Sequence, residues 1–395
     1  ILSMPKYRPL ADVELEKSWE KMTWYERMKG ATLNPTDPET QRLLEQMVDH
    51  FVPLFTSPFF NANSDETYDL GEGKTKELAQ EIGKGRLYLN HIEWINALSH
   101  KYGRRMMFWG DVVKQHPELV PEIPKDALLL NWGYNAEMDY DSTKLFTDTG
   151  LDVFVCPGTS GWNRILNGLN NADLNIRRFA AAGKQYGAVG LLNTDWGDFG
   201  HYNLLSGSLH GMAVGAAMAW NVGRPEADEF DRIWNILFFA DPEGKGVKGL
   251  RELARPGDEG DTWIQLYASF DNLRALRRTS DSEAKQLIQQ GEAAARIFEE
   301  YSRQGKGDTR VNAELRHISL MSALLGEKIL LARELSENAG RRNARLAARL
   351  EAFADRLEPL ITGGLVATYA PLDAEALYSA RTPQEYEQVR ADRRG

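Results

Sequence analysis

The chain has 395 residues, a formal net charge of −10 and a single cysteine, Cys156. This acidic balance, without a run of Lys and Arg, argues against a nucleic-acid partner, and one cysteine excludes an intrachain disulfide framework and a cysteine-rich metal site. No stretch approaches the ~20 consecutive apolar residues of a membrane-spanning helix, and the length fits roughly two to three domains, or one barrel of ~250 residues with an appendage.

The N-terminal part begins at Ile1 without the basic start and the continuous apolar segment of a signal peptide. We expect any such signal to precede Ile1, so the location stays unknown and the sequence favours the cytoplasm only slightly. Residues 12–29 fit a helix or a loop. The first clear helix begins at residues 34–38, where Thr36 or Asp37 can cap the N-terminus and Pro38 suits the first turn.

An apolar run at residues 52–60 predicts a short buried strand, which ends in Asn61 and, shortly after, in Asp65 and Glu66. In parallel α/β folds, chemistry collects at the carboxyl ends of strands, because the strand fixes the backbone while the loop exposes the side chains. Consecutive residues of an extended strand point to opposite sides, so the two carboxylates can take different roles. The simpler interpretation is that both only cap the next helix.

Four further apolar runs follow, each ending in polar residues and most of them in a tryptophan. We predict strands at residues 105–109, 127–132, 152–156 and 188–193, with helical patterns between them, notably at 86–102 and 174–186. Five strands in one direction describe one wall of a parallel sheet, whose natural closure is a (β/α)8 TIM-type barrel in an α/β fold. Because five strands do not close a barrel, we expect its first strands to precede Ile1.

Beyond Asn221 no strand-like run recurs, and charged, Ala- and Leu-rich segments with helical periodicity take over. We predict helices at residues 262–278, 282–303, 312–338 and 344–361, and a frayed end at 391–395. The charge runs here are typical of solvated helix faces. The sequence therefore divides into a catalytic barrel portion at residues 1–235 and an all-helical C-terminal region at residues 236–395.

Tryptophans follow four of the predicted strands: Trp109, Trp132, Trp162 and Trp196. Aromatic rings stack on the apolar C–H faces of sugars, and carboxylates accept hydrogen bonds from sugar hydroxyls. A single tryptophan in such a place is commonly a core or loop anchor, but four of them favour a carbohydrate pocket. The carboxylates expected among them are Asp65, Glu66, Asp111, Asp195 and Asp198.

These residues resemble the family 20 glycoside hydrolases, the β-N-acetylhexosaminidases, in which one strand of a (β/α)8 barrel ends in an Asp-Glu pair. Asp65-Glu66 stands in the place of that pair. Trp109-Gly110-Asp111 is similar to the Trp-x-Glu/Asp after the next strand, and Trp132 to the tryptophan after the one following. Trp196-Gly197-Asp198 is similar to the Trp-x-Glu that closes the barrel, so the resemblance spans residues 33–221.

The resemblance implies retention by substrate assistance, in which the sugar's own 2-acetamido oxygen attacks the anomeric carbon. Glu66 would protonate the leaving oxygen and then activate water, and Asp65 would orient and polarise the acetamido group. An acid in this role needs an apolar setting that favours its neutral form. The tryptophans at 109, 132 and 196 would wall the sugar pocket, Asp111 would bind substrate, and Asp198 would accept from the 4- or 6-hydroxyl.

The sequence departs from the family pattern at three points. The family's His-x-Gly-Gly before the pair is replaced by residues 61–64, where Asn61 can still form a hydrogen bond. Cys156-Pro157-Gly158 replaces the Tyr and Asp that bind the acetamido oxygen, so this contact falls to Trp162 or to a neighbouring hydroxyl, or does not exist. The arginine that grips sugar hydroxyls would lie on strands before Ile1.

Two other functional classes fit the same residues. A conventional retaining glycosidase would set Asp111 or Asp198 as nucleophile against Glu66, with the carboxyl groups ~5–5.5 Å apart. A glycan-binding protein would keep the tryptophans without needing Glu66. In each case the expected partner is a carbohydrate, here an N-acetylhexosaminide of either the gluco or the galacto series, with no cofactor.

Histidines add little to this picture. His116 and His201 are typical of loop or packing residues, and His201 is the better candidate for the pocket. The spacing of His and Cys supports no metal site. The oligomeric state is left open.

Overall fold

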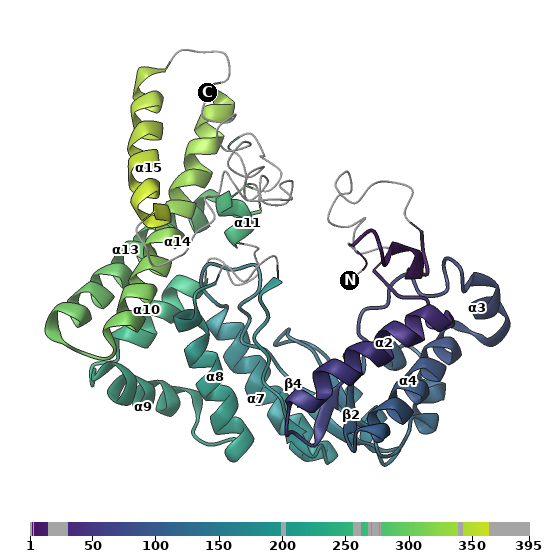
Figure 1. The fold of residues 1–395 in the computed structure, drawn as a ribbon. Helices are drawn as coiled ribbons and strands as arrows, with labels where there is room; N and C mark the ends of the chain where they lie inside the picture. Colours follow the sequence, from purple (N-terminus) through teal and green to yellow (C-terminus); the bar gives the residue numbers. More distant parts are fainter. Residues whose placement is uncertain are drawn as a thin grey trace. The chain divides into compact units, whose positions relative to one another are not determined.

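The computed structural model describes residues 2, 4–14, 31–198, 203–255, 262–267, 270, 276, 278–338 and 343–362 (Figure 1). The chain forms two compact units: the first comprises Ile1–Gly133, Asp139–Cys156 and Phe179–Leu192, and the second comprises Tyr134–Met138, Pro157–Arg178 and Asn193–Gly395. Most of residues 12–29 and all of residues 391–395 lie outside the described residues. Neither compact unit is one continuous stretch of the chain, and the division into domains after residue 235 stays a prediction.

The first unit contains a parallel five-stranded sheet. Its strands, neighbours in chain order, are β1 (Phe59–Asn61), β2 (Arg105–Trp109), β3 (Leu128–Trp132), β4 (Asp152–Cys156) and β5 (Gly190–Leu191). The register pairs Asn61 with Met107 and Trp132 with Cys156, so the carboxyl ends of these strands lie along one edge. The predicted parallel order is therefore confirmed, and closure into a barrel stays a prediction.

Helices alternate with these strands. They are α2 (Pro38–Phe51), α3 (Lys76–Ile82), α4 (Lys84–Lys101), α5 (Asp111–Lys114), α6 (Ser142–Thr147) and the second half of α7 (Leu169–Tyr186), with 3-10 turns η1 (Arg8–Leu10), η3 (Val52–Leu54) and η4 (Pro117–Glu122). Of the two predicted caps of α2, Asp37 is the one used, because its carboxylate accepts from the Glu39 backbone N–H at 2.8 Å. Helix α4 buries Leu89 and Ile92 in one cluster with Met106 and Phe108 of β2. This cluster is the core on which the sheet rests.

The strand predicted at residues 52–60 is wrong over most of its length. Residues 52–54 form the 3-10 turn η3, because Pro53 lacks the N–H that a strand needs and its fixed φ suits a helical turn. Only Phe59–Asn61 pairs with β2. The strand is also not buried, since the Phe59 side chain is 42% exposed. Among the described strands, β1 has a neighbour on one side only, which leaves that ring uncovered.

The second unit is helical beyond residue 203. Its helices include α8 (Leu205–Trp220), α9 (Ala227–Phe239), α10 (Lys245–Ala254), α11 (Thr262–Tyr267), α13 (Asp281–Gln304), α14 (Thr309–Glu337) and α15 (Ala344–Thr362). The three longest predicted helices are confirmed to within a few residues, and part of the helix predicted at 262–278 lies outside the described residues. Ser280 and Glu283 form a capping box at the start of α13, which fixes where that helix begins.

Helices α13 and α14 run side by side at close range (Figure 1). A Cβ added to Gly291 would lie 2.5 Å from the Ser319 carbonyl oxygen, and one added to Gly326 would lie 2.2 Å from the Ala284 carbonyl oxygen. Both glycines are therefore required by the approach of the two backbones rather than by a turn. The hydrophobic core of this unit surrounds the contact, with Phe298 and Leu325 fully buried.

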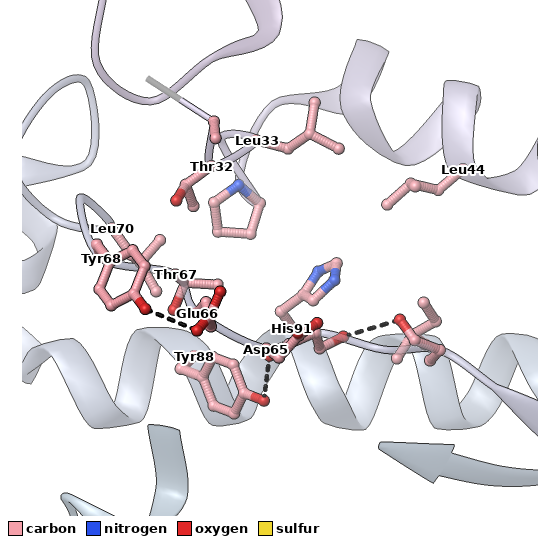
Figure 2. A pocket seen from close by; sticks show the side chains of 15 residues that line it. Thr32, Leu33, Leu44, Asp65, Glu66, Thr67, Tyr68, Leu70, Tyr88 and His91 are labelled. Carbon is pink, nitrogen blue, oxygen red and sulfur yellow. Dashed lines mark hydrogen bonds between the residues drawn. The ribbon is translucent and has the colours of Figure 1, made fainter. Parts of the chain in front are cut away.

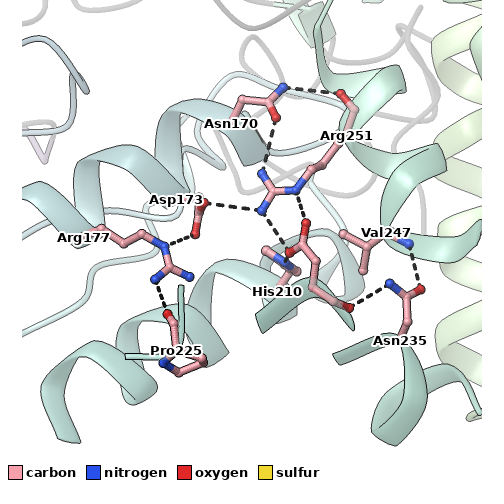
Figure 3. A network of polar contacts seen from close by, with 9 residues as sticks. Asn170, Asp173, Arg177, His210, Pro225, Asn235, Val247 and Arg251 are labelled. Carbon is pink, nitrogen blue, oxygen red and sulfur yellow. Dashed lines mark hydrogen bonds and ion pairs between the residues drawn. The ribbon is translucent and has the colours of Figure 1, made fainter. Parts of the chain in front are cut away.

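A network of charges joins four helices of the second unit (Figure 3). Arg251 of α10 donates through Nε and Nη2 to both oxygens of Asp231 on α9, at 2.5 and 2.9 Å. On the α7 side, Asp173 lies 3.4 Å from Arg251 and accepts from Arg177 at 2.8 Å. His210 of α8 completes the network, with Nε2 2.9 Å from Asp231. Burial raises the pKa of Asp231, but the hydrogen bonds from His210 and Arg251 outweigh it, so this pKa lies below its usual range.

We expect Arg251→Met to lower the free energy of unfolding by about 3 kcal/mol, because it leaves two largely buried carboxylates short of a cation. Since the pKa of Asp231 is depressed in the folded chain, its stabilising contribution is present above pH ~4 and is lost as the pH falls through the folded pKa. Denaturant unfolding between pH 2 and 7 should show a shallower acid dependence in the variant. Arg232→Met, at an exposed arginine of α9 next to Asp231, is the control and should change stability little.

Candidate active site

The loop after β1 has an unusual backbone. Asn63, Ser64 and Glu66 have φ values of 57°, 63° and 52°, in the left-handed region that residues with a Cβ seldom adopt. Of the six described non-glycine residues with positive φ, five lie in two loops, this one and the loop at residues 160–163. Strain of this kind persists only where surrounding contacts hold it, and it concentrates at functional sites.

Asp111 holds the strained loop against the next two strands. One carboxylate oxygen accepts from the Glu66 backbone N–H at 3.0 Å, and the other accepts from the Trp132 indole N–H at 3.2 Å. Both oxygens are thus engaged within the chain. Asp111 therefore fixes where Glu66 lies, a positioning role that sequence reasoning did not give it.

Trp109 holds the same loop from β2. Its backbone N–H donates to the Asn63 carbonyl oxygen at 3.0 Å, and its indole N–H donates to the Asn63 side chain at 3.3 Å. Only 4% of Trp109 is exposed, which leaves little ring for a sugar. Asn61 in turn accepts from the Asn63 backbone N–H at 3.0 Å, so it supports the turn. Trp132 is half-buried and keeps part of its ring at the surface.

The two adjacent carboxylates have different environments. Asp65 is half-buried, and its pKa is raised by burial and by the nearby charges of Asp111 and Glu66, against the lowering effect of a hydrogen bond with its own backbone. Glu66 is exposed, and its Oε1 accepts from the Tyr68 hydroxyl at 2.7 Å. The tryptophan-lined setting expected for Glu66 stays a prediction, since the described residues that line the cavity beside it include alkyl side chains and no tryptophan.

Asp65→Asn should raise the melting temperature at pH 7, because it removes an ionised carboxylate that the fold disfavours. A folded pKa above the ordinary value means that ionisation of Asp65 costs the folded state nothing below pH ~4 and costs it most above the raised pKa. The gain should therefore shrink as the pH is lowered toward 4. Thermal unfolding of both chains across that range checks the sign, and Asp49→Asn, an exposed aspartate of α2, is the control.

A cavity of about 380 Å³ lies beside this pair in the first unit (Figure 2). Asp65 and Glu66 line it together with Tyr68, Tyr88 and His91. Tyr88 is buried, and its hydroxyl donates to the Ser64 carbonyl oxygen at 2.7 Å, which is a third contact on the strained loop. Burial lowers the pKa of His91 to about 4, so this ring is neutral at physiological pH.

The remaining predicted residues lie in the second unit. Trp196 donates through its indole N–H to the Tyr134 hydroxyl at 2.6 Å, and the rings of Tyr134 and Trp162 lie 4.9 Å apart. The two tryptophans thus share one tyrosine as neighbour. Asp198 is exposed at the end of the same segment. His201 lies outside the described residues.

Asp195 belongs to a buried polar cluster of the second unit. It accepts from the Ser208 hydroxyl at 2.9 Å and from the Thr159 hydroxyl. Asn167 lies in the same cluster, donating to Ser208 at 3.1 Å. Through these contacts, Asp195 anchors the loop after β4.

Six of the predicted residues therefore belong to the first unit and four to the second. The first set is Asn61, Asp65, Glu66, Trp109, Asp111 and Trp132, and the second is Trp162, Asp195, Trp196 and Asp198. Sequence reasoning missed Tyr68, Tyr88, His91 and Tyr134. Only Tyr134 carried a signal, since it lies two residues after the end of a predicted strand.

Within the residues that the structure describes, no group of three or more His, Cys, Asp and Glu side chains is placed to hold a metal ion. Over the same residues, no helix combines the length and the apolar character that crossing a membrane requires.

Comparisons with known proteins give distant structural likenesses only. No family model matches the chain, and no curated protein does. A β-N-acetylhexosaminidase from Bacteroides fragilis is 18% identical with a TM-score of 0.39, over 54% of this chain and 47% of its own. A chitobiase from Flavobacterium johnsoniae is 12% identical with a TM-score of 0.40, over 88% of this chain and 60% of its own. A GH138 enzyme that targets pectin rhamnogalacturonan II is 11% identical with a TM-score of 0.42, over 71% of this chain and 52% of its own.

All three TM-scores lie below 0.5. The chain spans between about half and three fifths of the length of these solved proteins. At this low sequence identity, the solved structures to which the chain is similar include a β-N-acetylhexosaminidase and a chitobiase.

Proposed function

We propose that the chain is a glycoside hydrolase that removes terminal β-linked N-acetylhexosamine, with Glu66 as general acid and base and Asp65 as the residue that orients the acetamido group. The observation that carries the proposal is the Asp65-Glu66 pair on its strained loop at the carboxyl end of β1, held there by Asp111. Two adjacent carboxylates with different environments suit two different roles in one reaction.

The proposed reaction needs no protein nucleophile. The acetamido oxygen forms a bond to the anomeric carbon while the bond to the leaving oxygen breaks, and Glu66 supplies the proton that this oxygen takes up. Asp65 stabilises the positive charge that grows on the acetamido nitrogen. Water then attacks the anomeric carbon, the bond from this carbon to the acetamido oxygen breaks, and a proton of the water passes to Glu66, which restores the enzyme and retains the configuration.

Contacts of the loop support these roles. The Tyr68 hydroxyl orients Glu66 through Oε1, and the backbone hydrogen bond to Asp111 fixes the residue from the other side. Asp65 is half-buried, which strengthens its interaction with a developing positive charge. Trp132, the half-buried ring tied to Asp111, is the tryptophan of this unit that we assign to the wall of the sugar pocket.

A conventional two-carboxylate mechanism is the alternative that uses the same residues. Asp111 is poorly suited to be the nucleophile, because each of its oxygens already accepts a hydrogen bond from an N–H within the chain. The exposure of Glu66 is the observation that favours a second candidate, a glycan-binding protein without turnover.

The test is a set of 4-nitrophenyl β-glycosides of N-acetylglucosamine, N-acetylgalactosamine and glucose, assayed with the full chain between pH 4 and 8. We expect release of nitrophenol from the two N-acetyl substrates and not from the glucoside, which lacks the acetamido group. Equal rates on the glucoside would contradict substrate assistance. Binding of N-acetylglucosamine without any release would instead identify a glycan-binding protein.

A further inference from the structure

The cavity beside Asp65 and Glu66 has two chemically different sides (Figure 2). The loop after β1 contributes the carboxylates and the Tyr68 hydroxyl. Leu33, Leu44 and Ile95, from the segment before α2, from α2 and from α4, contribute alkyl groups. Figure 2 shows Leu33 and Leu44 across the cavity from the carboxylates. The lining thus suits a molecule with a polar atom at one end and an apolar body.

Two polar side chains of this lining, Tyr88 and His91, are engaged or uncharged, whereas the buried Thr67 hydroxyl has no hydrogen-bond partner among the described residues. The Tyr88 hydroxyl donates to the Ser64 carbonyl oxygen, and the half-buried His91 ring, whose centroid lies 5.7 Å from that of Trp94, carries no charge at neutral pH. Among the described residues that line the cavity, none is a tryptophan, a lysine or an arginine. A second sugar has hydroxyls around its whole ring, and burying them against alkyl groups without partners is costly.

We propose that this cavity receives the leaving group of the substrate, and that this group is an apolar alcohol, aryl or alkyl, rather than a second sugar. The inference rests on the proposed function, because it takes Glu66 as the acid that meets the glycosidic oxygen. Since Glu66 lines the cavity, the group beyond that oxygen enters among Leu33, Leu44 and Ile95. A volume of about 380 Å³ lies within the range of small-molecule sites.

A series of alkyl N-acetyl-β-glucosaminides tests the proposal, because methanol, butanol and hexanol need similar protonation and differ mainly in apolar surface. With the full chain, kcat/KM should rise about threefold to fourfold per methylene from methyl to butyl. The disaccharide with a second N-acetylglucosamine as leaving group should be a poorer substrate than the butyl glycoside. Equal kcat/KM along the alkyl series, or a preference for the disaccharide, overturns the inference and leaves the proposed function standing.

Variants at two positions of α2 test whether this cavity causes the rise of kcat/KM along the alkyl series. Leu44→Trp fills the cavity and should abolish the rise along the alkyl series. Leu44→Ala, which removes bulk instead of adding it, should reduce the rise per methylene. Met47→Trp is the matched control, because Met47 lies on the same helix, is 43% exposed and does not line the cavity. An equal effect of Met47→Trp and Leu44→Trp would overturn the assignment of this cavity.

Binding separates a failure of this inference from a failure of the proposed function. Titration of the full chain with 4-propylphenol, followed by NMR, should show saturable binding that Leu44→Trp removes and Met47→Trp keeps. If the phenol binds in this way but no glycoside is hydrolysed, the proposed function fails and the apolar site stands. If glycosides are hydrolysed but the phenol does not bind, or binds equally to Leu44→Trp, the proposed function stands and the apolar leaving-group site fails.

Discussion

Glu66→Gln is expected to reduce turnover of alkyl glycosides by at least ~10²-fold, the usual scale for a positioned general acid. The glutamine keeps the size of the side chain and can still accept from the Tyr68 hydroxyl, so the loop should hold its shape. A 4-nitrophenyl glycoside should lose less in its first step, because its leaving group needs little protonation. Steady-state kinetics on both substrates measures the difference.

Comparing the loss of turnover on the alkyl glycoside with the loss on the nitrophenyl glycoside shows whether Glu66 acts as the acid. Glu72→Gln changes an exposed glutamate a few residues further along the chain and should leave kcat unchanged. Equal losses for alkyl and nitrophenyl glycosides in Glu66→Gln would remove Glu66 from the acid role. An unchanged kcat on both would remove it from the reaction.

Replacing the substrate's N-acetyl group by N-trifluoroacetyl should slow the wild-type chain by orders of magnitude, because fluorine withdraws electrons from the attacking oxygen. Asp65→Asn should reduce kcat on the ordinary substrate by about 10²-fold, since a neutral amide stabilises the growing positive charge poorly. Both effects act on one step. The trifluoroacetyl substitution should therefore add less to the loss in Asp65→Asn than in the wild-type chain.

A protein nucleophile would respond differently to these changes. The rate would be nearly indifferent to trifluoroacetylation, and a 2-fluoro sugar would trap a covalent glycosyl-enzyme on Asp111 or Asp198. Mass spectrometry of the treated chain distinguishes the two mechanisms. Asp49→Asn on α2 controls for the loss of one negative charge.

Much of the fold could be predicted because its signals are local. The apolar runs at residues 105–109 and 152–156 coincide with β2 and β4, and the helical pattern after Pro38 coincides with α2. The run at residues 52–60 misled because Phe55 and Phe59 are apolar yet 51% and 42% exposed. An apolar residue in a sequence does not state whether a neighbour covers it, and here β1 has one strand beside it among the described residues.

The residues of the candidate site could be predicted only where they come shortly after the end of a predicted strand. Asp65, Glu66 and Asp111 each come shortly after an apolar run. No local pattern, however, predicts that the Asp111 carboxylate accepts from the Glu66 backbone N–H, 45 positions earlier in the chain. Tyr88 and His91 lie on a helix whose periodicity marks them as ordinary positions of α4. Which side of a helix meets a loop depends on how the helix packs, and that is not encoded in the local pattern.

The left-handed loop at residues 63–66 implies that, on heating, the proposed activity is lost before the helices unfold. Its backbone conformation is not one that these residues favour in isolation, and contacts from Trp109, Asp111 and Tyr88 hold it. Those partners come from β2, from α5 and from α4, so the loop is correct only while all three remain docked. Local opening at this edge costs less than global unfolding. The protein should therefore become inactive at temperatures where its helices are still intact, and recover activity on cooling.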